Sequence, residues 1–260
     1  MKFSKYLLLC ENKAQPISEE EAERIANEKC NIILQSNIHI YRGINSKEPY
    51  MFGDAKFDIP RKSAYTSNFS TLIIDNSPNW NEYPKRSKSY ICSGSNVYAG
   101  GYGTLYKVYP FDGANIGICP DVDIWYSFVQ TLAKLNITCI DNLNHIIELI
   151  FESMTNRVNV DKSFASLKSA CEEIDTILSA RNYDFYKVAS DFDHMRPNCF
   201  NLLRYLTKQH KTPLLHGFMT LLDPTVNNFT HIKLNEITSK PLFHNNEVWT
   251  DSPCIFEKVT

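Results

Sequence analysis

The sequence has little glycine and no long apolar run, and each shortage excludes a class of protein. Nine glycines among 260 residues are too few for a collagen-like chain or a glycine-rich linker. No stretch approaches the 18 or more apolar residues of a membrane-spanning helix. The apolar run Tyr6 to Cys10 is also too short for the core of a signal peptide. We therefore expect a soluble, cytoplasmic protein.

The chain also lacks an excess of charge of one sign. It lacks the common short motifs that bind nucleotides or metals. The chain carries 27 basic and 29 acidic residues, which argues against a nucleic-acid coat protein and against an acidic tail. Its eight cysteines include no C-x-x-C pair, and dispersed cysteines are typical of buried apolar side chains in a reducing compartment. No G-x-x-x-x-G-K-[ST] loop is present. With 43% hydrophobic residues, the chain has the composition of a globular protein.

The first half of the sequence indicates one helix followed by several strands. Ser18 and Glu21 form a capping box, and the apolar spacing after it predicts a helix from residue 18 to about 34. Alternation predicts a strand over 38–43, and residues 45–85 are typical of a long loop with short helical pieces. Further strands are predicted over 87–92, 104–109 and 114–119, with a short helix and turn over 96–103.

The texture changes after Pro120, where apolar residues recur at helical spacing. Residues 121–222 are predicted to be mainly helical, with breaks near 136–142 and 156–161. The last forty residues return to strands, which are predicted over 229–236, 247–249 and 254–259. We expect one α+β domain over residues 1–260, in which 121–228 form a mainly helical insertion between β-rich halves.

Three segments combine residue types that can carry chemistry. The first is Tyr41-Arg42-Gly43, the second runs from Arg86 to Gly103, and the third runs from Asn245 to Trp249. Each has an ordinary structural interpretation by itself, as a rim salt bridge, a packed hydroxyl or a solvated strand end. In this order, however, they resemble the arginine–serine–glutamate class of mono-ADP-ribosyltransferases.

The resemblance covers residues 37–119 and 229–259. In that family an arginine ends the first core strand, a serine-rich strand follows with an alanine and an aromatic–glycine pair, and a late glutamate precedes a hydrophobic strand and a proline. The resemblance implies a split β-sandwich with flanking helices. The overall pattern also resembles uncharacterised proteins of tailed phages, for which the location would be the host cytoplasm or the virion.

The family's reaction implies NAD as the substrate and a role for each motif residue. Breaking the nicotinamide–ribose bond passes through an oxocarbenium-like state. By resemblance, Arg42 holds the pyrophosphate or ribose oxygens, a task that suits a forked guanidinium. Glu247 would bind the ribose hydroxyl and stabilise the developing positive charge. The catalytic serine could be Ser87, Ser89 or Ser93, and strand alternation favours Ser89.

Further contacts to NAD are expected from a few neighbours of the motif, and the acceptor stays open. The neighbours are Gly43, Ser87, Tyr90 and Tyr102, the last two as aromatic surfaces for a flat ring. Asn245 stands where the family usually has Glu or Gln, and an amide cannot act as a general base. The acceptor could be a protein, a nucleic acid or, in an NAD glycohydrolase, water. The alternative function is a catalytically inactive structural or interaction protein of the same fold, such as a phage virion component.

No metal site is expected from the sequence. The cluster Asp191 to His194 offers three possible ligands, but no second cluster at metal-ligand spacing follows it. We interpret it as a capping or turn segment.

Overall fold

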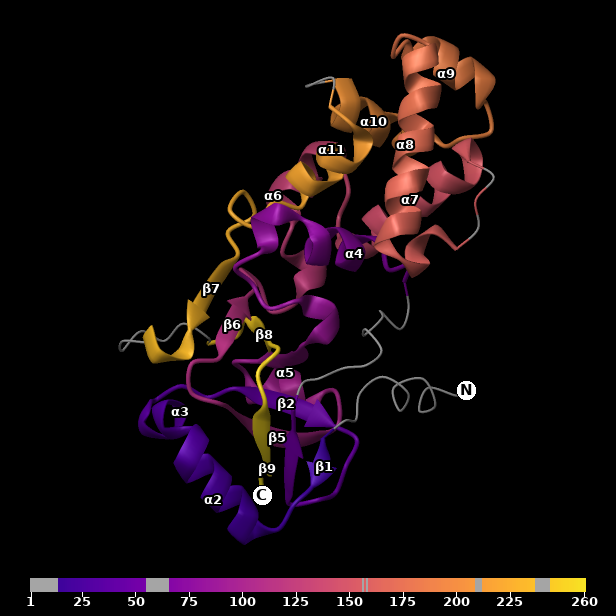
Figure 1. Cartoon of the computed structure of the whole chain (residues 1–260). Coiled ribbons are helices and arrows are strands. Elements are labelled where there is room, and N and C mark those ends of the chain that lie inside the picture. The colour runs from indigo at the N-terminus through magenta and orange to yellow at the C-terminus, as the bar shows by residue number, and fades with distance from the viewer. Residues whose placement is uncertain (1–13, 55–65, 156, 158, 209–211, 237–243) are drawn as a thin grey trace. The chain divides into compact units, whose positions relative to one another are not determined.

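The computed structural model describes residues 14–54, 66–155, 157, 159–208, 212–236 and 244–260. The chain divides into two compact units. The sheet unit consists of the described parts of Met1–Ala64, Glu82–Ser127 and Asn228–Thr260, and the helical unit of the described parts of Tyr65–Asn81 and Phe128–Asn227 (Figure 1). The sequence analysis predicts one domain with an insertion over 121–228, whereas the structure divides the chain in two and adds residues 65–81 to the helical part.

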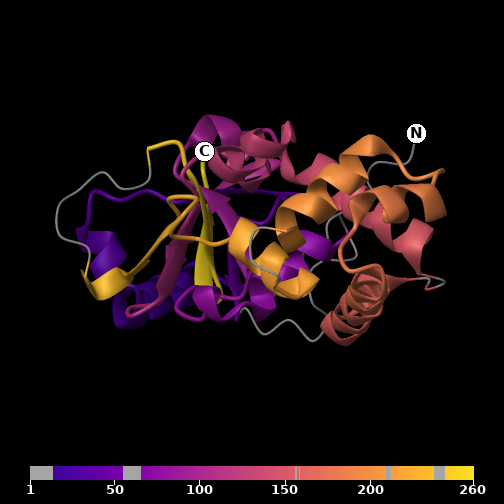
Figure 2. The same cartoon turned by 90° about the horizontal axis from the view of Figure 1, so that it is seen from above.

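The sheet unit holds a nine-stranded antiparallel sheet, so the α+β prediction is confirmed. The strand order is β1-β3-β9-β5-β2-β4-β8-β6-β7, and Figure 2 views the same strands from above. The strands are β1 (Gln15–Pro16), β2 (Tyr41–Ile44), β3 (Tyr50–Gly53), β4 (Tyr90–Ser93), β5 (Thr104–Pro110), β6 (Asn115–Ile118), β7 (Thr230–Lys233), β8 (Glu247–Thr250) and β9 (Cys254–Lys258).

The sheet is joined at its centre by a single residue pair. Strand β2 pairs with β5 over four residues, but with β4 only through Tyr41 and Ser93. The five strands β1-β3-β9-β5-β2 and the four strands β4-β8-β6-β7 are therefore two groups held together along one short seam. Beyond Tyr41 no further pair joins β2 to β4 among the described residues.

Two helices near the start of the described residues pack against the group of five strands: α2 (Glu19–Lys29) and α3 (Asn31–Gln35). The predicted cap is confirmed, because the Ser18 hydroxyl accepts a hydrogen bond from the backbone N–H of Glu21 at 3.2 Å. One helix was predicted over this region, and the structure has two. The carboxylate of Asp112 accepts hydrogen bonds from the first two backbone N–H groups of α3 and so caps a separate helix start.

Most predicted strands appear within a few residues of their expected bounds, and the clearest differences concern β4 and β3. The strand predicted over 87–92 begins at Tyr90, because residues 86–88 form a 3-10 helix, η2 (Arg86–Lys88). Strand β3 lies inside the region predicted as a loop, and its partners are β1 and the distant strand β9. A four-residue strand between turn formers has too little alternation to be found without those partners.

The helical unit contains no strand among its described residues. Its helices are α4 (Phe69–Asn76), η1 (Pro78–Trp80), α6 (Val129–Leu132), η4 (Ala133–Leu135), α7 (Ile140–Met154), η5 (Val160–Lys162), α8 (Phe164–Ala180), α9 (Phe185–Asp191), α10 (Pro197–Lys208) and α11 (Leu214–Leu221). The apolar spacing that predicts α8 is confirmed, since Leu167, Cys171, Ile174 and Leu178 are fully buried. Among the described residues, no helix is long and apolar enough to cross a membrane.

Candidate functional site

Three neighbouring strands at the centre of the sheet carry the three motif segments. The order β2-β4-β8 places the Arg42 strand beside the serine strand and the serine strand beside the Glu247 strand. Ser93 lies directly opposite Glu247, and Tyr41 lies directly opposite Ser93. Residues opposite each other in an antiparallel sheet point to the same face. Ser93 and Glu247 therefore share one face and one row.

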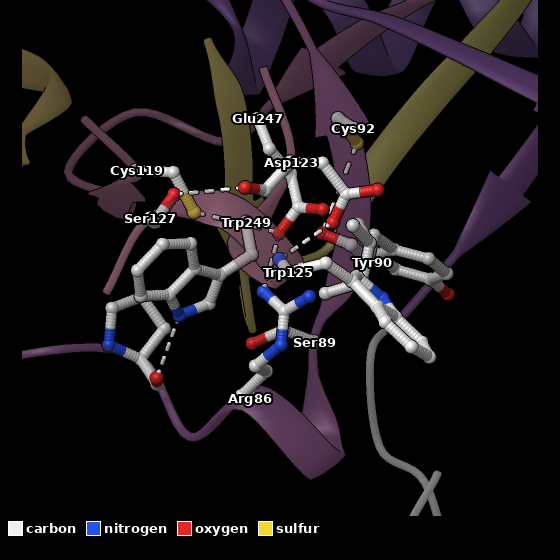
Figure 3. A network of polar contacts seen from close by, with 12 residues as sticks. Arg86, Ser89, Tyr90, Cys92, Cys119, Asp123, Trp125, Ser127, Glu247 and Trp249 are labelled. Atoms are coloured by element: carbon white, nitrogen blue, oxygen red, sulfur yellow. Dashed lines mark hydrogen bonds and ion pairs between the residues drawn. The ribbon is translucent and has the colours of Figure 1, made fainter. Parts of the chain in front are cut away.

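Glu247 is a buried carboxylate held from several sides (Figure 3). One carboxylate oxygen, Oε1, forms an ion pair with Nη1 of Arg86 at 2.6 Å, and the thiol of Cys119 donates to the same oxygen at 3.6 Å. The backbone N–H of Glu247 donates to the carbonyl of Asp121 at 3.1 Å, and the backbone N–H of Cys119 donates to the carbonyl of Glu247 at 2.9 Å. The strand end that carries Glu247 is thus fixed in position.

Arg86 belongs to η2 and is anchored beside Trp249 of β8. Its guanidinium carbon lies 5.6 Å from the centroid of the Trp249 ring. The indole N–H of Trp249 donates to the carbonyl of Pro84 at 2.9 Å, so the ring also holds the segment that leads into η2. Burial is the largest single influence and acts to lower the pKa of Arg86, but Glu247, Cys119 and Asp123 together outweigh it and the pKa is raised.

Two more ionisable groups face this ion pair. Burial, followed by the charge of Glu247, raises the pKa of Asp123. Its carboxylate accepts from the backbone N–H of Trp125 at 2.9 Å and caps η3 (Ile124–Tyr126). The same two causes raise the pKa of the Cys119 thiol well above its ordinary value, so Cys119 stays protonated and is no nucleophile at neutral pH.

Arg42 takes a different place from the one its predicted role requires. It follows Tyr41 on β2, so strand alternation points it to the face opposite Ser93 and Glu247. Its guanidinium donates to the carbonyl of Ile91 and lies 5.8 Å from the centroid of the Tyr90 ring. The arginine that pairs with Glu247 is Arg86.

The other predicted serines and tyrosines are spread around the site. Ser89 is buried just before β4, and its hydroxyl donates to the carbonyl of Lys85 at 2.8 Å. Ser87 lies in η2 and is half-buried. Tyr90 packs in the core with its ring 5.1 Å from that of Phe256, so it has no free face for a ligand ring. Tyr102 is 69% exposed. Alternation cannot select Ser89, because the strand begins only at Tyr90.

Gly43 has a packing role that explains the Tyr-Arg-Gly string. The short helix α5 (Asn96–Gly100) crosses β2 so closely that a Cβ atom on Gly43 would lie 2.2 Å from the carbonyl oxygen of Ala99. Real Cβ atoms never approach a backbone oxygen so closely, so only glycine fits. Gly103, which ends the turn after α5, has a φ of 142° and lies against the backbone of Ile44.

Arg86, Cys119 and Asp123 were not predicted as site residues. Arg86 stands in the basic string Lys85 to Lys88, a pattern that is by itself typical of a solvated strand edge, and Cys119 is one of the dispersed cysteines. Their proximity to Glu247 is created by strand pairing between segments far apart in the sequence, which no local pattern encodes. A weak signal was present for Ser93, since it directly precedes Gly94 at the end of the apolar run.

Among the described residues, no group of three His, Cys, Asp or Glu side chains is arranged to hold a metal ion. In the Asp191 to His194 cluster, Asp191 forms an ion pair with Arg181 at 2.6 Å.

Comparisons with known proteins leave the family open. No family model matches the sequence, no curated protein matches it significantly, and no solved structure matches the fold significantly. The function is therefore argued from the site and from the motif resemblance.

Proposed function

We propose that the protein is a mono-ADP-ribosyltransferase that cleaves NAD at the nicotinamide–ribose bond and transfers ADP-ribose to a protein or nucleic-acid acceptor. The observation that carries the proposal is the row at the centre of the sheet. There Ser93 and Glu247, which come from distant motif segments, lie opposite each other on adjacent strands.

The sheet supports the proposal through its seam. The resemblance implies a split β-sandwich, and the single pair between Tyr41 and Ser93 joins two otherwise separate groups of strands at the row that carries Glu247. The family's Ser-Thr-Ser string is absent from the sequence, so the serine is chosen by its position, and Ser93 is the candidate that lies opposite Glu247. We therefore assign the catalytic serine to Ser93.

The chemistry follows from the groups in the row. As the C–N bond breaks, its electron pair leaves with nicotinamide and positive charge develops on the ribose. The Glu247 carboxylate would accept a hydrogen bond from a ribose hydroxyl and stabilise the positive charge. Stabilisation of this kind is worth about 3–4 kcal/mol at preorganised sites. The acceptor's nucleophile then bonds to the ribose carbon, and its proton passes to solvent. Asn245, which is exposed, supplies no base for that proton.

One observation favours a second candidate, a protein of the same fold without catalysis. Glu247 is engaged in a buried ion pair with Arg86, and Arg42 points away from it. An ion pair of this kind can hold a fold together without taking part in any reaction. In this alternative the row serves structure, and the protein acts by binding a partner.

Release of nicotinamide from NAD separates the two candidates. We expect release by the wild-type protein, a loss of at least about 100-fold in Glu247→Gln, and no change in the control Glu28→Gln, whose carboxylate lies on the exposed face of α2. Release that increases when cell lysate supplies an acceptor would identify a transferase, and release that does not would identify a glycohydrolase. No release from the wild-type protein, with no thermal stabilisation by NAD, would support the non-catalytic candidate.

A further inference from the structure

We infer that Arg86 is the positioning residue of Glu247: its guanidinium holds the carboxylate in the orientation that the row requires. The resemblance assigns the orientation of the glutamate to a serine. The consequence for catalysis rests on the proposed function, whereas the ion pair itself can be tested without it.

The geometry of the pair is that of a fixed contact. The side chains of Arg86 and Glu247 are 12% and 11% exposed, and the two atoms that meet are 2.6 Å apart. Arg86 is also held against Trp249, two residues after Glu247 on the same strand. One strand thus supplies both the carboxylate and the ring that places its counter-ion. Exposed ion pairs between flexible side chains have no such second anchor.

An arginine is needed here because the surroundings are otherwise acidic. The ionisable groups that face the pair are Asp123 before η3 and the Cys119 thiol after β6, with Asp121 beside Asp123. Arg86 is the cation whose charge acts on both Cys119 and Asp123. A lysine could supply the charge, but it lacks the planar guanidinium that stacks on the Trp249 ring.

The pairing leads to a directional expectation for catalysis. Without Arg86, the Glu247 carboxylate loses the contact at 2.6 Å that fixes its oxygen, so it can turn away from the row. A carboxylate that is displaced from the ribose stabilises its positive charge far less, since small misplacements of a catalytic group are costly. Activity therefore falls. If Arg86 instead blocked the carboxylate, its removal would increase the activity.

The test compares Arg86→Met, Arg86→Lys, Glu247→Gln and the double variant Arg86→Met/Glu247→Gln with the wild-type protein. Lys88→Met is the matched control, because Lys88 is an exposed basic residue of the same 3-10 helix. Urea unfolding at several pH values gives the coupling between the two side chains. Nicotinamide release at pH 7 gives the effect on turnover, and the Arg86→Lys variant shows whether a cation alone restores it.

Each variant changes the equilibrium constant of unfolding by some factor relative to the wild-type protein. We expect the factor of the double variant to differ at least about tenfold from the product of the two single-variant factors, because contacting residues are coupled. We also expect Arg86→Met to lower release at pH 7 by more than about tenfold, since a catalytic carboxylate that is no longer held in place loses most of its effect. Arg86→Lys should restore part of the release, and Lys88→Met should leave release unchanged.

Additive unfolding effects would overturn the inference, and so would release that is unchanged or increased in Arg86→Met. A wild-type protein that releases no nicotinamide would refute the proposed function. The unfolding cycle would then still decide whether Arg86 holds Glu247.

Discussion

The two units bury different kinds of polar group. In the described part of the sheet unit, the buried residues include the charged Arg42 and Glu247, and Arg86 is nearly buried beside them. In the described part of the helical unit, the buried polar residues are all uncharged: Asn68, Ser70, Ser77, Thr131, Asn144, Thr155, Thr207 and Asn227. Burying a charged group costs free energy unless the group is paired. In the described residues, this cost falls on the sheet unit.

This difference favours the sheet unit as the place of a functional site. Within the helical unit, buried amides and hydroxyls close local contacts, as when Asn144 accepts from both the backbone N–H and the hydroxyl of Ser70. In the sheet unit, Glu247 pairs with the guanidinium of Arg86, and burial together with the charge of Glu247 raises the pKa of Asp123. Ionisable groups that perturb one another in this way are typical of functional sites.

The largest effect is expected where the backbone of the sheet unit is most crowded. Gly43→Val places carbon atoms against the carbonyl oxygen of Ala99, 2.2 Å from the Cβ position, and the backbone must move. We expect a loss of at least about 3 kcal/mol in the free energy of unfolding, at the upper end of overpacking effects. The control is Gly100→Ala in α5, where nothing lies within 4 Å of the added carbon. Chemical denaturation of both variants measures the contrast, and equal stability would contradict the close approach of α5 to β2.

The second-largest effect is expected in the helical unit. Leu178 of α8 is fully buried in an apolar environment. Leu178→Ala should lower the free energy of unfolding by about 2–5 kcal/mol, because it removes buried methyl groups and leaves a cavity. Below the unfolding transition, nicotinamide release should stay at the wild-type level. A folded Leu178→Ala protein that loses release would show that the helical unit takes part in the reaction.

A smaller effect concerns the pH dependence of the sheet unit. The pKa of Asp123 is raised in the folded protein, so its contribution to stability is fully present below the ordinary aspartate pKa of about 3.9 and is lost as the pH rises through the raised value. Asp123→Asn keeps an oxygen for the Trp125 N–H and removes this titration. We expect the stability of the wild-type protein, relative to the variant, to fall as the pH rises above the ordinary aspartate pKa.

The same measurement in a Glu247→Gln background provides the check. Because the charge of Glu247 contributes to the raised pKa, the pH-dependent difference should shrink there. A difference that is independent of pH in both backgrounds would contradict the proximity of the two carboxylates.

Much of the fold could be predicted from local pattern, because its elements are set by local physics. The Ser18 cap and the apolar stripe of α8 are written into a few neighbouring residues. Strand β3 was not predicted, since it exists through its pairing with β9. The break after Lys29 depends on Asp112, which is distant in the sequence.

The site was harder to predict than the fold. Glu247 is buried in a polar contact network, whereas the serine preferred by alternation, Ser89, lies outside the strand. Arg42 was chosen because it ends a strand, yet the counter-ion of Glu247 comes from η2. Which arginine meets which carboxylate is decided by strand pairing, and a motif read along the chain does not contain that information.

The central claim is that Ser93 and Glu247 form the reactive row, and two serine variants test it most directly. Ser93 and Ser89 are both buried, and each hydroxyl makes a hydrogen bond to the backbone. The Ser93 hydroxyl accepts from the N–H of Ser95, and the Ser89 hydroxyl donates to the carbonyl of Lys85. Nicotinamide release should fall at least about tenfold in Ser93→Ala, which loses a hydroxyl beside the reacting ribose, and should stay near the wild-type level in Ser89→Ala. Loss of release in Ser89→Ala with retention in Ser93→Ala would contradict the claim.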